Sequence, residues 1–275
     1  MALIEIDDYY PYSYQPINRY GYGRPPHDLL QKMFAKRLPA YARLVQEFSK
    51  YALDIGQISH DPDPENPLQP CWDNGWLPSM DGIALYGLVS AAKPRRYFEV
   101  GSGNSTKFVA RAKKLNSPQT VIVSIDPAPR AEIDLLCDQV IREPLQNINV
   151  DFFNQLMPGD ILFIDGSHRM LQNSDVTVFY LDILPHLKPG VIIGQHDILL
   201  PWDYSMEWAQ RMYSEQYALA SVLLAAEDAF EIIFPTFYVS QLEQKLLQPL
   251  LNTIWTFPNL QNIVPFGSSF WMTKK

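Results

Sequence analysis

The chain has 275 residues, 47% of them hydrophobic, and a formal net charge of −8. This length can bury a large core in one domain, with or without an added segment, and the acidic balance argues against a broad nucleic-acid-binding surface. No apolar run approaches the roughly 18 residues that span a bilayer, and the acidic start MALIEIDDYY lacks the pattern of a secretory signal. We therefore expect a cytoplasmic protein with neither a nucleic-acid nor a membrane partner.

The cysteine content is low. Cys71 and Cys137 lie far apart and lack the spacing of a zinc or redox motif. Two reduced thiols in a cytosolic protein are the expected state.

The N-terminal third separates into an arm, a helical segment and a loop. Residues 1–25 are rich in tyrosine and have no helical or strand period; they form either an arm packed on its own domain or an aromatic cover over a pocket or dimer contact. Residues 29–58 have apolar residues at helical spacing, with a break or kink expected at Pro39. A proline-rich acidic loop follows at residues 61–70. We expect residues 1–80 to form an arm and helical extension, and residues 81–275 to form the main domain.

From Asp81 onward, short apolar runs alternate with amphipathic segments. The expected strands are 97–100, 120–125, 139–141, 160–164, 191–194, 230–234 and 269–273. The expected helices are 81–92, 105–115, 131–137, 174–184, 206–224 and 240–252. This alternation predicts an α/β domain in which helices cover both faces of a mostly parallel sheet.

A glycine turn lies between the first strand and its helix, in YFEVGSGNSTKFVARA. Gly101 and Gly103 permit close backbone approach, and Ser105 or Thr106 can cap the helix. Such a turn presents backbone N–H groups to a polar ligand at the carboxyl ends of the strands. It lacks the Gly-Lys-Ser/Thr ending of a P-loop, and Thr106 stands where a dinucleotide fingerprint needs glycine or alanine.

The next strand ends in an acid. In VIVSIDP, Asp126 comes 23 positions after Gly103, where a carboxylate can accept hydrogen bonds from both ribose hydroxyls of an adenosine cofactor. The alternative is a turn residue that precedes Pro127.

Two further strands each end in an acid and a histidine. PGDILFIDGSH places Asp165 and His168 after one strand, and PGVIIGQHDI places His196 and Asp197 after its neighbour. Four titratable side chains are thus expected to converge at one sheet edge, as in an active site. Alternatively, Asp165 holds a cofactor's amino group or caps a helix, while the other pair forms hydrogen bonds within its loop.

Together, the motifs EVGSGNS, SIDP, FIDGSH and GQHDI resemble those of class I S-adenosylmethionine-dependent methyltransferases. They look most like the branch with a FIDGSH motif, which is similar to macrocin-type sugar O-methyltransferases. The resemblance covers roughly residues 81–208. It implies a Rossmann-like, doubly wound sheet of seven strands, mostly parallel, in which the last strand runs antiparallel.

The resemblance also implies a cofactor site for S-adenosylmethionine. Its methionine part would lie among Glu99, Gly101 and Gly103, and Asp126 would hold the ribose. Glu143, after the third strand, is a candidate adenine partner. The full predicted cofactor-binding set is Glu99, Gly101, Ser102, Gly103, Asn104, Ser105, Asp126 and Asp165.

For catalysis, the resemblance implies His168 as the base, with Asp165 beside it. Methyl transfer is an in-line displacement on a sulfonium carbon, and a histidine with a near-neutral pKa can remove the acceptor's hydroxyl proton. Related metal-dependent enzymes imply Asp165, His196 and Asp197 as ligands of a divalent cation. His196 departs from the expected oxygen ligand, so manganese, iron or zinc would suit the set better than magnesium.

The predicted function is methyl transfer to a hydroxyl oxygen of a small-molecule acceptor whose identity stays open. Trp202, Tyr204 and Trp208 either line the acceptor pocket or pack the following helix. One alternative is a nicotinamide-dependent oxidoreductase, against which Thr106 and the lack of a Tyr-x-x-x-Lys pair argue. Another is a non-catalytic cofactor-binding protein, against which the four-residue acid–imidazole cluster argues. Assembly into a homo-oligomer is left open.

Overall fold

The computed structural model describes residues 17–275. Most of the tyrosine-rich arm therefore lies outside the described residues. The strands are β1 (Arg96–Val100), β2 (Val121–Ile125), β3 (Gln139–Ile141), β4 (Ile161–Ile164), β5 (Ile192–Gln195), β6 (Phe230–Pro235) and β7 (Phe270–Lys274). The α-helices are α1 (Asp28–Ala35), α2 (Leu38–Ser49), α3 (Ala52–Gly56), α4 (Ser79–Ala92), α5 (Asn104–Asn116), α6 (Asp175–Val178), α7 (Met206–Gln210), α8 (Glu215–Ala225), α9 (Thr236–Gln241) and α10 (Gln248–Leu251).

The strands form one seven-stranded sheet in the order β3-β2-β1-β4-β5-β7-β6. β1 to β5 pair in parallel, whereas β7 runs antiparallel to both β5 and β6. The predicted Rossmann-like fold, with its antiparallel last strand, is confirmed. Because β1, β2, β4 and β5 are parallel neighbours, their carboxyl ends meet at one edge of the sheet, where ligands bind in this architecture.

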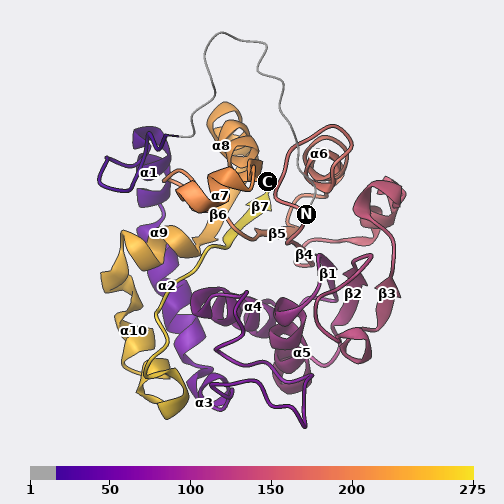
Figure 1. Ribbon diagram of the computed structural model, residues 1–275, viewed down its shortest axis with the longest axis vertical. Coiled ribbons are helices and arrows are strands. Elements are labelled where there is room, and N and C mark those ends of the chain that lie inside the picture. Colours follow the sequence, from indigo (N-terminus) through magenta and orange to yellow (C-terminus); the bar gives the residue numbers. More distant parts are fainter. Residues whose placement is uncertain (1–16) are drawn as a thin grey trace.

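Helices cover both faces of the sheet. Figure 1 shows α4 and α5 on one face and α6 and α8 on the other. All but two residues of α4 are buried, because it packs against α5, α2 and α9. No helix among residues 17–275 is long and apolar enough to cross a membrane.

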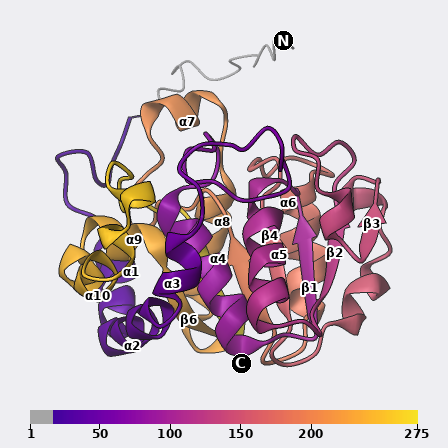
Figure 2. The ribbon, with the colours of Figure 1, turned by 90° about the horizontal axis from the view of Figure 1, so that it is seen from below.

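The N-terminal helices pack at the β6 end of the sheet, opposite β3 (Figure 2). Phe48 of α2 meets Phe234 of β6 edge-on at 5.5 Å between ring centroids, and Phe34 of α1 meets Tyr238 in the same way. These helices belong to the same hydrophobic core as the sheet. The division of the chain near residue 80 stays a prediction.

Several helix predictions need correction. The break expected at Pro39 is confirmed, since α1 ends at Ala35 and Pro39 lies in the first turn of α2, where its missing N–H costs nothing. A second break, between α2 and α3, was not predicted. The helix expected at residues 131–137 is wrong. The chain forms only a 3₁₀ turn there, with Ile133 buried and Leu135 87% exposed, a pattern without a helical face.

The helix expected at residues 206–224 is two helices. α7 ends at Gln210, and Met212 adopts a left-handed conformation with φ +62°, which no helix continues through. α8 then begins at Glu215. The backbone N–H of Ser214 donates to the carbonyl oxygen of His168 at 2.8 Å, so the break brings Glu215 beside the loop that follows β4.

The other two helix predictions hold in part. Residues 174–184 are helical, but only Asp175–Val178 is α-helix and the rest continues as π and 3₁₀ turns. Residues 240–252 contain the end of α9, a 3₁₀ turn and α10.

The turn after β1 requires a glycine at its first position. Gly101 has φ +80°, and a Cβ atom there would lie 1.7 Å from the carbonyl oxygen of Asp165, because the chain leaving β4 crosses directly over it. Gly103 differs, since a Cβ atom there would meet nothing within 4 Å and its backbone is extended. Packing therefore demands Gly101, whereas the space beside Gly103 is open.

We predict that Gly101→Ala lowers the free energy of unfolding by about 2–4 kcal/mol, from the positive φ and the steric overlap together. Gly103→Ala is the matched control and should cost about 1 kcal/mol or less. Urea denaturation followed by circular dichroism measures both. Equal losses in the two variants would contradict the role given to Gly101.

Candidate active site

A buried carboxylate supports the glycine loop from below. Glu99, in β1, accepts hydrogen bonds from the hydroxyls of Tyr97 (2.9 Å) and Thr106, and Thr106 Oγ1 in turn accepts from the backbone N–H of Gly103 at 3.1 Å. Complete burial raises the pKa of Glu99 to about 7, against the hydrogen bonds, which lower it. Glu99 therefore braces the loop and the start of α5 from inside the core.

Asp126 holds the loop from the side. Its Oδ2 accepts from the backbone N–H of Ser102 at 2.8 Å, and its Oδ1 accepts from Ala128 N–H at 2.8 Å. The hydroxyls of Ser102 and Ser124 lie 2.7 Å apart beneath it. Asp126 remains partly exposed at the carboxyl end of β2. It therefore fills the turn role that the sequence offered as an alternative and still presents part of its carboxylate to solvent.

The remaining predicted cofactor residues lie in the same loop or beside it. Asn104 begins α5 and donates to the carbonyl and side-chain oxygens of Asn74 at 3.4 and 3.2 Å, which ties the loop to the segment before α4. Ser105 is buried. Glu143 is exposed and accepts only from the side chain of Asn147.

Asp165, His168, His196 and Asp197 converge at the carboxyl edge, as the sequence predicts. Asp165 Oδ1 lies 3.5 Å from His168 Nε2 and 3.3 Å from His196 Nδ1. Asp197 completes the ring, with 3.3 Å from Oδ2 to His168 Nε2 and 3.3 Å from Oδ1 to His196 Nδ1. Both histidines are buried, while Asp165 keeps 29% of its side chain exposed and so faces the edge.

Each histidine is held from behind by a further carboxylate that the sequence analysis missed. Glu215, at the start of α8, accepts from His168 Nδ1 at 2.5 Å. Asp81, in the first turn of α4, lies 3.2 Å from His196 Nε2. Nothing local in the sequence marks either acid, because they lie 47 and 115 positions from their partners.

Asp81 also joins three segments of the core. It is fully buried, and its oxygens accept from the hydroxyl of Thr236 (2.6 Å) and from the backbone N–H groups of Ser268 (2.8 Å) and Ser269 (2.9 Å). These donors and His196 outweigh burial and hold the pKa of Asp81 below its ordinary value. The carboxylate thus connects α4 with the start of β7 and the end of β6.

The carboxylates favour the charged form of both imidazoles. Burial disfavours the imidazolium of His168, but Glu215, Asp197 and Asp165 outweigh it and raise the pKa to about 9. The pKa of His196 is raised well above its ordinary value, against burial, by Asp165, Asp197 and Asp81. Burial raises the pKa values of Asp197 and Glu215.

The arrangement suits proton transfer. Glu215 accepts the Nδ1 proton of His168, which selects the tautomer and leaves Nε2 directed at the two aspartates of the edge. Within residues 17–275, no group of three or more His, Cys, Asp or Glu side chains is arranged to hold a metal ion. His196 uses both ring nitrogens in ion pairs.

The aromatic residues after β5 lie in a cluster of their own. Tyr204 is fully buried and packs with Leu199 and Phe237, with Trp202 and Trp208 at the margin. Tyr204 also meets Trp208 of α7 and Tyr217 of α8, so it packs the following helices, as the second interpretation expects. Tyr213, from the break between α7 and α8, approaches His168 to 4.6 Å between ring centroids and was missed by the sequence analysis.

One cavity lies away from these side chains. It has a volume of about 680 Å³ and is enclosed by residues 65–69 and 129–135 with Arg142, on the far side of the loop after Asp126. None of the four edge residues lines it. The candidate active site is therefore identified by its titratable side chains and not by this cavity.

Residues 98–198 match a family model described as a methyltransferase domain. The matched segment runs from β1 to the loop after β5, and so contains the glycine loop, Asp126 and the four edge residues. No curated protein matches the chain.

Solved structures with a similar fold include an O-methyltransferase from Bacillus cereus in complex with SAH, at 16% identity over 84% of this chain and 90% of that one, with a TM-score of 0.40. The SAH-bound Podospora anserina methyltransferase PaMTH1 is 14% identical over 96% and 99%, with a TM-score of 0.43. The mycinamycin-pathway methyltransferase MycE, in complex with Mg and SAH, is 20% identical over 48% and 36%, with a TM-score of 0.33. The fold is therefore Rossmann-like, and residues 98–198 within it are similar to a methyltransferase domain.

We predict that Asp81→Asn lowers the free energy of unfolding by about 3–5 kcal/mol, because it leaves buried donors and the His196 charge without their partner. Asp28→Asn is the control, since Asp28 is exposed and pairs only with Lys32, and its loss should change stability by about 0.5 kcal/mol or less. Chemical denaturation at pH 7 measures both. A loss below about 1 kcal/mol for Asp81→Asn would show that the network tolerates a neutral residue.

Proposed function

We propose that this protein is an S-adenosylmethionine-dependent methyltransferase that acts on a hydroxyl oxygen of a small-molecule acceptor. The observation that carries the proposal is the direct contact between the glycine loop and the acid–imidazole edge. The backbone N–H of Asp165 donates to the carbonyl oxygen of Val100 at 2.8 Å, and Gly101 packs on the Asp165 carbonyl. A ligand on the loop therefore lies next to His168 and its partners.

The loop fits the proposed cofactor in two respects. The space beside Gly103 is open, and the partly exposed Asp126 lies at the end of β2, where it can accept from ribose hydroxyls. When bound, S-adenosylmethionine supplies an electrophilic methyl group on a positively charged sulfur. Glu99 is buried and supports the loop through Tyr97 and Thr106, and its predicted contact with the cofactor stays a prediction.

The charge of the edge favours a cationic ligand. Asp81, Asp165, Asp197 and Glu215 contribute four negative charges, and the two imidazolium groups return two, which leaves about −2 in a mostly buried cluster. A sulfonium is attracted by this charge, whereas the diphosphate of a nicotinamide cofactor is repelled. Thr106, buried and engaged with Glu99, also stands where a dinucleotide loop needs its third small residue.

His168 is the proposed base. Its Nε2 accepts the proton of the acceptor hydroxyl while Glu215 holds Nδ1 and stabilises the imidazolium that forms. Asp165 and Asp197 flank Nε2 at 3.5 and 3.3 Å and orient the ring and the hydroxyl. Proximity of the deprotonated oxygen to the methyl group then allows in-line displacement.

The metal set of Asp165, His196 and Asp197 stays a prediction. The three side chains do meet, but His196 pairs with carboxylates through both nitrogens, and the group is not arranged as metal ligands.

For the cofactor, we expect S-adenosylhomocysteine to bind the purified protein with a measurable heat in titration calorimetry. Asp126→Ala should weaken binding about tenfold or more, because a charged hydrogen-bond partner is lost. Asp182→Asn replaces an exposed acid in the π-helical turn after α6 and should bind as the wild type does. A folded protein that binds no S-adenosylhomocysteine would overturn the proposal.

For the base, we expect His168→Ala to lower kcat about 10²- to 10⁴-fold while cofactor affinity is retained. In the wild type, the rate should rise with pH toward about 9, because His168 accepts a proton only when neutral. Glu215→Gln removes the charge that raises this pKa, so the rise should move to lower pH and the limiting rate should fall.

Glu207→Gln is the matched control, since Glu207 is exposed on α7 and pairs with Arg211. Its pH profile should superimpose on that of the wild type. An unchanged profile in Glu215→Gln, or full turnover in His168→Ala, would exclude the proposed pair. Cofactor binding without transfer to any of a broad panel of hydroxylated acceptors would favour a non-catalytic binding protein.

For the metal, elemental analysis of the purified protein and turnover after exhaustive chelation decide the prediction. If Asp165, His196 and Asp197 hold a cation, chelation should abolish turnover and manganese, iron or zinc should restore it better than magnesium. Undiminished turnover after chelation would remove the requirement.

A further inference from the structure

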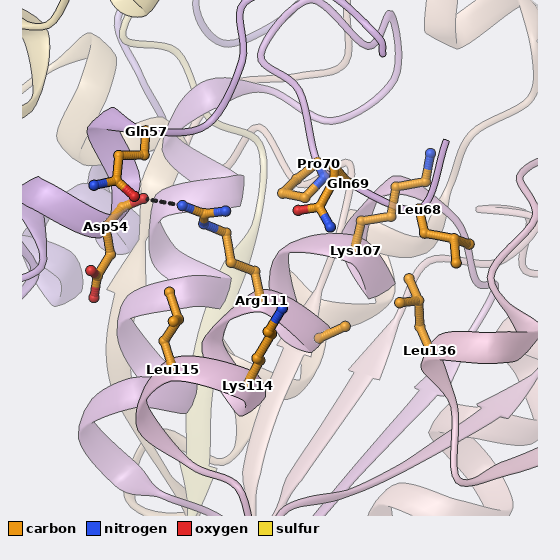
Figure 3. Close-up of a pocket in the computed structure, with 11 residues that line it drawn as sticks. Asp54, Gln57, Leu68, Gln69, Pro70, Lys107, Arg111, Lys114, Leu115 and Leu136 are labelled. Carbon is orange, nitrogen blue, oxygen red and sulfur yellow. Dashed lines mark hydrogen bonds between the residues drawn. The ribbon is translucent and has the colours of Figure 1, made fainter. Parts of the chain in front are cut away.

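A second, smaller pocket lies on the outer face of α5, away from the site described above. It has a volume of about 220 Å³ and lies between α3, residues 68–70 and α5 (Figure 3). Its walls combine apolar side chains with cations and amides. Drug-sized ligands occupy pockets of about 300–1,000 Å³, so this pocket suits a smaller molecule.

Three cations of α5 line this pocket. Lys107, Arg111 and Lys114 are spaced four and three residues apart, which places them on one face of the helix. Within residues 17–275 none of the three forms an ion pair, although the chain carries a net charge of −8 and offers many acids. Lys113, on another face of α5, does pair, with Asp138 at 2.6 Å.

Arg111 has donors to spare. Its Nη2 donates to the carbonyl oxygen of Asp54 at 2.8 Å, and its Nε is enclosed without a hydrogen-bond partner in the described structure. A buried N–H group without an acceptor is costly, so the unpartnered Nε favours an acceptor in this pocket. The guanidinium is therefore anchored through Nη2, whereas its Nε lacks an acceptor.

Asp54 is the single acid that lines the pocket, and it is engaged elsewhere. Its Oδ2 accepts from the hydroxyl of Tyr86 at 3.1 Å, and Figure 3 shows its carboxylate turned away from the Arg111 guanidinium. Gln57 and Gln69 add side-chain amides at the rim. Three cations and one acid leave a local charge of about +2, which matches a dianion.

We propose that this pocket binds a small phosphate-type dianion, either free phosphate or the phosphate group of a small metabolite. A phosphate carries −1.5 to −2 charges near pH 7 and three acceptor oxygens. The planar guanidinium of Arg111 matches two of these oxygens, while Lys107 and Lys114 act as point charges from the same helix. The apolar side chains of Leu68, Leu115 and Leu136 limit the volume and lower the local screening of the charges.

The test uses the full chain and equilibrium binding. Inorganic phosphate, pyrophosphate and glycerol phosphate are titrated by calorimetry in chloride buffer of constant ionic strength. Saturable binding of inorganic phosphate is expected, and tighter binding of glycerol phosphate would identify a metabolite's phosphate group as the ligand. Arg111→Gln should weaken binding about tenfold or more, and Lys107→Gln should weaken it several-fold.

Lys113→Gln is the matched control and should bind phosphate as the wild type does. Arg111 also tethers α3, so its replacement can disturb the fold as well as the pocket. The double variant Lys107→Gln/Lys114→Gln avoids this, because it changes only exposed or half-exposed side chains of the same pocket. The proposal is overturned if inorganic phosphate shows no saturable binding in the chloride buffer. It is also overturned if Lys113→Gln weakens phosphate binding as much as the pocket variants do. These measurements need no turnover, so their outcome is independent of the proposed methyl transfer.

Discussion

The structure depends on the pairing of buried charge at the carboxyl edge of the sheet. Two imidazoles lie among four carboxylates, and each imidazole has an acid on both sides. A buried charge without a partner costs several kcal/mol, so these six side chains stay in place only together. Their partners come from α4, the ends of β4 and β5, and the start of α8. The active edge is thus also the junction at which distant parts of the chain meet.

Asp81 and Glu215 have different roles in this cluster of charges. Asp81 holds His196 and also the backbone that enters β7, so its contribution is architectural. Glu215 makes its one close ion pair with His168, so it acts on the group that faces the edge. A carboxylate paired with an imidazole therefore joins segments of the fold at His196, whereas at His168 it supports the proposed proton transfer.

Helix α5 lies between two regions of opposite charge. Its first turn supports the glycine loop beside the acidic edge, and its outer face presents the three unpaired cations. The separation is consistent with two kinds of ligand on one helix: a cationic sulfonium at the start and a small anion on the side. Packing on the opposite face holds α5 against α4, so neither region can move freely of the other.

Local pattern was sufficient for the architecture. Short runs of three to six residues predicted all seven strands to within one residue at each end. Three motifs, SIDP, FIDGSH and GQHDI, placed Asp126, Asp165, His168, His196 and Asp197 at strand ends, because side-chain alternation and turn residues are local properties. Helix ends were less predictable, since Met212 breaks a periodic segment by its backbone conformation. Asp81 and Glu215 could not be identified from the sequence, because acids are common at helix starts and the sequence does not distinguish a buried one from an exposed one. The sequence by itself determined the sheet and the edge; only the tertiary structure decided which acids stand behind the histidines, because those pairs form across 115 and 47 residues of chain.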